Sequence, residues 1–210
     1  MPKKFYKNEY KGKYKFIKKW YDDREGADFE HAIDSWLSQF DMCEQEFLLE
    51  CLKRYSYFRA AQYRYGIKVL YTKILEKYPL WKGDSYIFKI YKKEASYSDN
   101  FFNDFWLYNG IKNECKQNIE DFADYFDDIK NCFFIDDYIG SGNTIVSFLN
   151  RLLETYPKLK KKKIIILSLY LTQSGKLALE NFAIDHGLCL ETLYYQLGDK
   201  FFKEGKYFSG

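Results

Sequence analysis

The sequence predicts an α/β protein in which a helical segment over residues 1–80 precedes a parallel sheet over residues 81–210. In the first segment, apolar residues recur at helical spacing, which predicts amphipathic helices. In the second, short apolar runs alternate with longer segments at helical spacing, as in the βαβ crossovers that build parallel sheets. The composition, with 47% hydrophobic and 30% charged residues, is typical of a folded domain and not of a disordered chain.

Three helices are predicted in the first segment, and each has a recognisable apolar face. The apolar stripes run over residues 32–40, 47–55 and 67–75. Asp28 is placed to cap the first helix, and Asp41 with Glu44 forms a D-x-x-E capping box for the second. Pro79 is expected to end the third helix, because proline cannot continue one.

Strands and helices are predicted in alternation after Gly83. The strands are expected at residues 86–91, 132–135, 164–170 and 189–195, and the helices at residues 112–129, 143–156 and 173–186. Gly187 stands where the glycine that follows the end of a helix is expected. Ligands of such sheets bind beyond the carboxyl ends of the strands, so we expect the functional site at that edge.

Several classes of protein are disfavoured by the cysteines, the histidines and the hydropathy pattern. His31 and His186 are each alone, and the five cysteines have no C-x-x-C spacing, which argues against a zinc site or a Ser-His catalytic pair. No run of about 18 apolar residues occurs, so no membrane span is predicted. The first residues lack the apolar region of a secretory signal, so we expect a cytoplasmic protein with reduced thiols.

A loop rich in glycine and hydroxyl groups lies between a predicted buried strand and a predicted helix. Gly140 and Gly142 allow backbone N–H groups to approach an anion closely. Ser141 adds a hydroxyl donor. The helix begins near Asn143 or Thr144, and its N-terminus favours negative charge. These residues predict a cradle for one phosphate group.

Two carboxylates, Asp136 and Asp137, precede this loop. They repel phosphate, but they can accept hydrogen bonds from vicinal hydroxyls such as those of a ribose. The phosphate cradle and the two carboxylates together predict a pocket that binds ribose 5-phosphate. Two alternatives stay open, since a receiver or phosphatase domain also places acids after a strand, and a glycine-rich turn that only caps a helix would look alike. A Walker A loop is disfavoured because Asn143 stands where its lysine would be.

The run Ile135-Asp-Asp-Tyr-Ile-Gly-Ser-Gly-Asn-Thr144 resembles the phosphoribosyl-pyrophosphate (PRPP) binding signature of type I phosphoribosyltransferases. The order of predicted elements over about residues 84–196 is also similar to that family's core. The resemblance implies a phosphoribosyltransferase-like core that binds PRPP or a nucleotide, with Asp136 and Asp137 on the 2′ and 3′ hydroxyls and residues 140–144 on the 5-phosphate. It further implies Mg²⁺ bound with PRPP, held through the ligand and by Asp136 or Asp137 through water.

That family holds pyrophosphate in a loop after the first core strand. The candidate donors at this place are Lys92, Lys93, Ser96 and Ser98, in a stretch without glycine. The flexible catalytic hairpin of the family has no recognisable counterpart in residues 101–131. Two functions therefore stay open: transfer of a phosphoribosyl group to an acceptor, or non-catalytic sensing of PRPP or a nucleotide.

The first twenty residues combine eight lysines with six aromatic residues. This texture occurs in segments that bind nucleic acid, and it equally fits a solvated amphipathic helix. The run Trp36-Leu-Ser-Gln-Phe40 ahead of such a core is similar to bacterial conflict-system proteins, some of them associated with retrons, which implies a role in phage defence. An aromatic helical surface also predicts a protein partner or a homo-oligomer.

Overall fold

The chain forms two compact units, Met1–Gln62 and Tyr63–Gly210, and each is described by itself. The computed structural model describes residues 29–54, 60–81, 85–90, 97–110, 116–117 and 129–198. In the described part of the chain, no helix is both long enough and apolar enough to cross a membrane.

The described part of the first unit contains α3 (Phe29–Leu37) and α4 (Met42–Arg54). The predicted capping box opens α4: the Glu44 N–H donates to Asp41 Oδ1 and the Asp41 N–H donates to Glu44 Oε2, each at 2.9 Å. Among the α4 side chains that the structure describes, Leu49 is buried and Phe47 is 45% exposed. Leu48 and Cys51 of the predicted stripe are partly buried. The cap expected at Asp28 lies outside the described residues.

The second unit is built on a five-stranded sheet in the order β2-β1-β3-β4-β5, in which every neighbouring pair is parallel. The strands are β1 (Ser85–Lys89), β2 (Lys116–Gln117), β3 (Asn131–Ile139), β4 (Lys163–Thr172) and β5 (Cys189–Gly198). The parallel sheet predicted from the sequence is confirmed. Because all strands run the same way, their carboxyl ends share one edge, where β3 is central.

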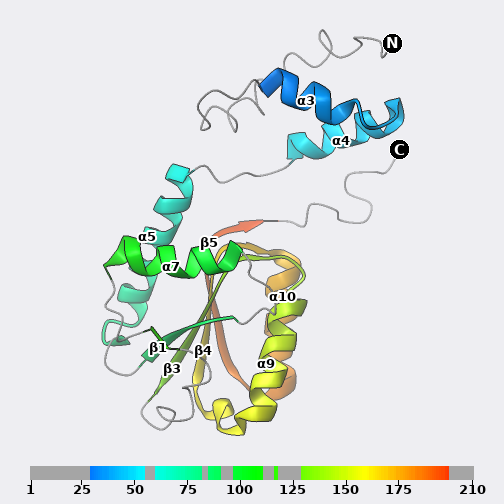
Figure 1. Cartoon of the computed structure of the whole chain (residues 1–210). Coiled ribbons are helices and arrows are strands. Elements are labelled where there is room, and N and C mark those ends of the chain that lie inside the picture. Colours follow the sequence, from blue (N-terminus) through cyan, green and yellow to red (C-terminus); the bar gives the residue numbers. More distant parts are fainter. Residues whose placement is uncertain are drawn as a thin grey trace. The chain divides into compact units, whose positions relative to one another are not determined.

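Helices cover both faces of this sheet (Figure 1). The helices α5 (Ala60–Lys77) and α7 (Tyr97–Asn109) pack on one face, and α9 (Asn143–Thr155) and α10 (Gln173–His186) pack on the other. Each layer has its own core: Phe133 faces α5 and α7, while Phe134 faces α9. A strand buried on both faces reads as a continuous apolar run, which is why β4 gave the clearest strand signal.

The helix α5 belongs to the sheet-containing unit. Ile67, Leu70 and Ile74 are fully buried in the core shared with the sheet. Gly66 lets the helix approach closely, since a Cβ there would lie 2.8 Å from the side chains of Leu169 and Tyr195. The second unit therefore begins at Tyr63, and the change of texture near residue 80 marks the first strand.

Two predicted helix boundaries are confirmed on the other face. The helix α10 spans the predicted residues, and Gly187 follows it with a φ of 63°. The helix α9 begins at Asn143 and ends one residue before the prediction. Both were readable because a helix end needs particular residues: a glycine at the left-handed position after α10, and an apolar face on α9 that repeats at helical spacing.

One prediction for the stretch between β1 and β3 is wrong where the structure describes it, and one helix there was missed. Residues 116 and 117 form β2, which pairs with β1, so they do not belong to a helix over residues 112–129; the neighbouring residues 111–115 and 118–128 lie outside the described part. The helix α7 was not predicted. Among its described side chains, Phe101, Phe102, Phe105 and Trp106 are buried, and their helical spacing was the signal available in the sequence.

Candidate functional site

The strand β3 continues beyond the two acids instead of ending before them. The main chain is paired with β4 at Asp136, opposite Ser168, and again at Tyr138 and Ile139, opposite Tyr170 and Leu171. The ladder with β1 stops one residue earlier than the acids, at Ile135 opposite Lys89. The prediction that the strand ends at residue 135 is therefore wrong for the β4 side of the sheet and correct for the β1 side.

The two acids differ in burial and in direction. Successive side chains of a strand point to opposite faces, so Asp136 and Asp137 leave β3 on opposite sides. Asp136 is only 2% exposed, whereas Asp137 is partly exposed. Asp137 lies on the side of α5 and α7, close enough to act on Tyr63: burial, the hydrogen bond to Asp104, and the charges of Asp104 and Asp137 raise the pKa of Tyr63.

The helix α7 brings a second carboxylate, Asp104, to the face of Asp137. The Tyr63 hydroxyl donates to Asp104 Oδ2 at 2.9 Å. One residue along α5, the Arg64 guanidinium lies over the Tyr108 ring, 5.6 Å from its centroid. Sequence reasoning missed Asp104, because its position follows from α7, and α7 was not predicted.

The loop after β3 adopts the conformation that its glycines suggest. Gly142 precedes α9 with φ 80° and ψ −11°, a left-handed conformation that favours glycine. The helix starts with the Val146 N–H donating to the Gly142 carbonyl at 2.9 Å. Gly142 has no side chain to cap the first turn, and the Asn143 N–H donates to the Ser141 hydroxyl oxygen at 3.4 Å. Ser141 is partly buried, while Asn143 and Thr144 are exposed. The polar groups of residues 140–144 are thus gathered at the N-terminus of α9.

The start of α10 packs against the back of this loop. Thr172, fully buried at the end of β4, donates its hydroxyl proton to the Gly140 carbonyl and accepts a hydrogen bond from the Gly175 N–H at 3.0 Å. A Cβ at Gly175 would lie 2.5 Å from the Gly140 oxygen. Sequence reasoning missed both residues; the only local signal was a T-x-x-G pattern at the end of the strongest strand.

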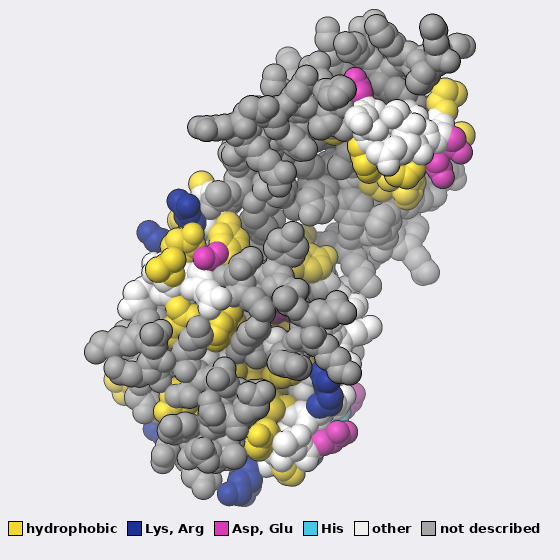
Figure 2. All heavy atoms as spheres, viewed as in Figure 1, with side chains coloured by type: hydrophobic (Ala, Val, Ile, Leu, Met, Phe, Trp, Pro, Cys, Tyr) yellow, Lys and Arg dark blue, Asp and Glu magenta, His cyan; other side chains and the backbone are white. Residues whose placement is uncertain are grey.

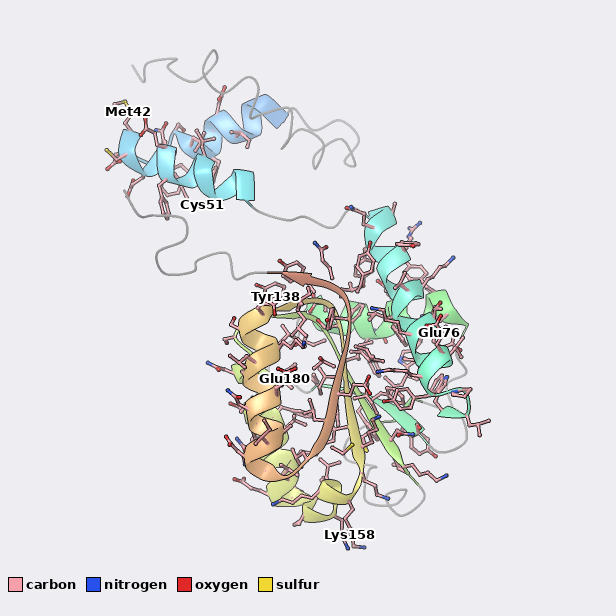
Figure 3. All side chains as sticks on the ribbon, turned by 180° about the vertical axis from the view of Figure 1, so that it is seen from behind. Met42, Cys51, Glu76, Tyr138, Lys158 and Glu180 are labelled. Atoms are coloured by element: carbon pink, nitrogen blue, oxygen red, sulfur yellow. The ribbon has the colours of Figure 1, made fainter. Side chains whose placement is uncertain are left out.

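An aromatic pair stands next to the loop at the carboxyl edge of the sheet. Tyr138, labelled in Figure 3, is 51% exposed and stacks on Tyr170 with ring centroids 5.6 Å apart and an angle of 13° between the rings. A Cβ at Gly140 would lie 3.1 Å from the Tyr138 ring. In the same view Lys158 lies at the opposite end of this unit.

The predicted pyrophosphate loop is only partly described. Lys92, Lys93 and Ser96 lie outside the described residues, as do the basic residues 1–20. Ser98 belongs to α7, so its expected place in a loop is wrong. On the face seen in Figure 2, the described lysine and arginine side chains of this unit are scattered and form no single patch. Among the described residues, no three histidine, cysteine, aspartate or glutamate side chains are grouped as metal ligands.

Comparison with known proteins places this chain in a family. The model of the PRTase-CE family matches residues 33–209, a longer stretch than the one whose resemblance was visible in the sequence. No match was found among curated proteins, and none among solved structures. Because the match covers most of the 210 residues, the chain belongs to the PRTase-CE family and is a phosphoribosyltransferase-like protein.

Proposed function

We propose that residues 140–144 bind the 5-phosphate of a phosphorylated ribose, PRPP or a nucleotide. The observation that carries this proposal is the N-terminus of α9, where the N-cap residue Gly142 lies in the left-handed conformation and supplies no side-chain hydrogen bond to the first turn. The first N–H groups of a helix have no partner inside the helix, and its N-terminus carries partial positive charge. A phosphate group satisfies both requirements at once.

The ribose contact is assigned to the acid that solvent reaches. A vicinal diol touches one side of the strand, and the two acids point to opposite sides. Asp137 is partly exposed, whereas Asp136 is 2% exposed and would have to be uncovered before it touched a ligand. Asp137 therefore accepts the ribose hydroxyls in this proposal, and Asp136 supports the end of the strand.

The residues present fit Mg²⁺ only as an ion that arrives with the ligand. Mg²⁺ keeps several waters and is commonly bound through substrate phosphates and one or two carboxylates. Asp137 offers such a carboxylate, and Asp136 could supply a second one only if it became exposed. Bound Mg²⁺ would offset the negative charge of pyrophosphate. The chain's own part in a transfer reaction is to fix the ribose and its phosphate while the bond from C1 to pyrophosphate breaks, which is catalysis by positioning and charge stabilisation.

The test measures binding by titration calorimetry, with ribose 5-phosphate and with PRPP plus Mg²⁺. Gly142→Ala puts a side chain at a φ of 80° and its Cβ 3.1 Å from the Gly175 oxygen, so we expect affinity to fall by at least about tenfold, or about 1.4 kcal/mol. Gly187→Ala is the matched control: it carries similar backbone strain at a φ of 63°, without neighbours within 4 Å, and it should bind as the wild type does. Equal affinity of the Gly142→Ala protein would contradict the proposal.

Phosphoribosyl transfer and non-catalytic sensing can be distinguished by whether bound PRPP releases pyrophosphate. A transferase releases pyrophosphate when PRPP, Mg²⁺ and the right acceptor are present, which a coupled pyrophosphate assay detects across a panel of nucleobases. Tight PRPP binding without release across that panel would favour the non-catalytic sensor. Failure of the wild type to bind any phosphorylated ribose would contradict both functions.

A further inference from the structure

We infer that Thr172 is a positioning residue that fixes the orientation of the peptide between Gly140 and Ser141, and that this orientation makes the loop able to accept an anion. The inference rests on the proposed phosphate site. Thr172 lies 32 residues from Gly140 in the chain and outside the loop, in β4. Its side chain is fully buried, so it acts on a ligand only through the loop.

The direction of each hydrogen bond at Thr172 follows from its partners. The Gly140 carbonyl oxygen can only accept, so the single hydroxyl proton of Thr172 goes to it. The Gly175 N–H can only donate, so it occupies a lone pair of the same hydroxyl. The contact with the Ser174 hydroxyl, at 3.0 Å, must then have Ser174 as its donor. The hydroxyl is satisfied in one arrangement, and that arrangement holds the Gly140 carbonyl toward the start of α10.

The orientation of that carbonyl decides what the loop presents to a ligand. In a planar trans peptide the C=O and the N–H point in opposite directions. With the Gly140 oxygen held by Thr172, the Ser141 N–H is directed away from α10. A flipped peptide would instead direct a carbonyl dipole at a bound phosphate, which repels it. The free-energy cost of such a flip is small at residue 140 because it is a glycine. A restraint from outside the loop is therefore needed to keep the peptide in one orientation.

Packing supports the hydrogen bond. A Cβ at Gly175 would lie 2.5 Å from the Gly140 oxygen and 3.2 Å from the Ile139 oxygen, so α10 touches the loop backbone itself. Gly142 is held from the same side, with a Cβ position 3.1 Å from the Gly175 oxygen. The backbone of residues 139–142 therefore packs directly against the first turn of α10.

The experiment uses the full chain with ribose 5-phosphate and inorganic phosphate as probes. Thr172→Val removes the hydroxyl while keeping a similar side-chain volume. We expect the affinity for ribose 5-phosphate to fall at least about tenfold, which corresponds to the loss of one hydrogen bond to a charged group, here from the Ser141 N–H to the phosphate. Thr172→Ser retains the hydroxyl and should restore affinity. Gly175→Ala keeps Thr172 but displaces the Gly140 oxygen, and it should lose affinity as well. Gly66→Ala is the control, because its clash is with the side chains of Leu169 and Tyr195.

A ligand-free measurement makes the outcome independent of the phosphate site. In amide NMR spectra, Thr172→Val and Gly175→Ala should shift the Ser141 resonance and speed its hydrogen exchange, while Thr172→Ser and Gly66→Ala leave it in place. An unchanged Ser141 amide together with wild-type affinity in Thr172→Val would overturn the inference. If that variant does not fold, an unchanged Ser141 amide in Gly175→Ala overturns it. If the wild-type protein binds neither probe, the proposed phosphate site is refuted. The NMR shift and hydrogen exchange of the Ser141 amide in Thr172→Val then still test whether Thr172 orients this peptide.

Discussion

At the scale of single residues, the site depends on the direction in which polar groups point. The two acids are neighbours in sequence, but they leave β3 on opposite faces, and only Asp137 is partly exposed. Gly140, by contrast, is held in place by a hydroxyl from another strand. Residue types alone suggested two equivalent acids and a self-sufficient loop, whereas the geometry separates the acids and makes the loop dependent on its support.

The separation of the acids predicts unequal effects of neutralising them. Asp137→Asn removes the charge that accepts the ribose hydroxyls, so we expect ribose 5-phosphate affinity to fall about tenfold, within the range for one charge-assisted hydrogen bond. Asp136→Asn changes a buried group and should lower the melting temperature more than the affinity. Calorimetric titration and thermal unfolding of both variants check this. The reverse order of affinities would show that Asp136, and not Asp137, faces the ligand.

At the scale of elements, α5 is attached to the sheet by a charged cluster as well as by its apolar face. Glu191 on β5 accepts a hydrogen bond from the Tyr78 hydroxyl at 2.8 Å and pairs with Lys163 at 3.1 Å and with Lys77. Burial acts to raise the pKa of Glu191, but the hydrogen bonds from Lys77, Tyr78 and Lys163 outweigh it, so the pKa is lowered. The cluster therefore favours the folded state only while Glu191 is ionised.

This lowered pKa predicts a loss of stability in acid. A carboxyl group whose pKa is lower in the folded than in the unfolded protein stabilises the fold above its unfolded pKa, near 4.5, and the gain disappears as the pH falls through the folded pKa. Glu191→Gln should cost about 1 kcal/mol at pH 7, and this difference from the wild type should shrink below pH 4.5. Urea unfolding at several pH values measures it.

A surface pair on α10 provides the control for that cluster. Glu180 lies 3.5 Å from Lys176 one turn away, and its side chain is 50% exposed. Exposed pairs of this kind contribute only about 0.3–0.5 kcal/mol. Glu180→Gln should therefore leave the pH dependence of unfolding almost unchanged. If Glu191→Gln and Glu180→Gln gave the same dependence of unfolding free energy on pH, the loss of stability at low pH could not be assigned to Glu191.

Elements were predictable from the sequence to the extent that their determinants are local. The strand β4 and the helix α10 were found because the apolar run lies within the strand and the terminal glycine directly follows the helix. The end of β3 was missed because Asp136, Tyr138 and Ile139 are paired with the partner strand β4, while the ladder with β1 has already stopped at Ile135. The support of Gly140 by Thr172 joins residues of two different strand ends, so no local pattern contains it.

At the scale of the whole sheet-containing unit, β3 is the strand on which both cores depend. Phe133 packs with Tyr78 and Trp81 on the side of α5 and α7, and Phe134 packs with Phe148 of α9 on the other side. Both phenylalanines are fully buried. The strand that carries the acids and leads into the loop is thus clamped from both faces, which keeps the proposed site in a fixed place at the carboxyl edge.

This arrangement predicts that either core controls the stability of the entire unit. Phe133→Ala and Phe134→Ala each remove a buried ring and leave a cavity, so each should cost about 3–5 kcal/mol, measured by urea unfolding. Leu107→Ala on α7, where the side chain is 73% exposed, should cost less than about 0.5 kcal/mol. Because the two rings lie in different layers of one cooperative unit, both variants should unfold in a single transition that fluorescence and circular dichroism report together. Two separate transitions in the Phe133→Ala protein would mean that the layer of α5 and α7 folds apart from the layer of α9 and α10, and the clamp on β3 would then not be cooperative.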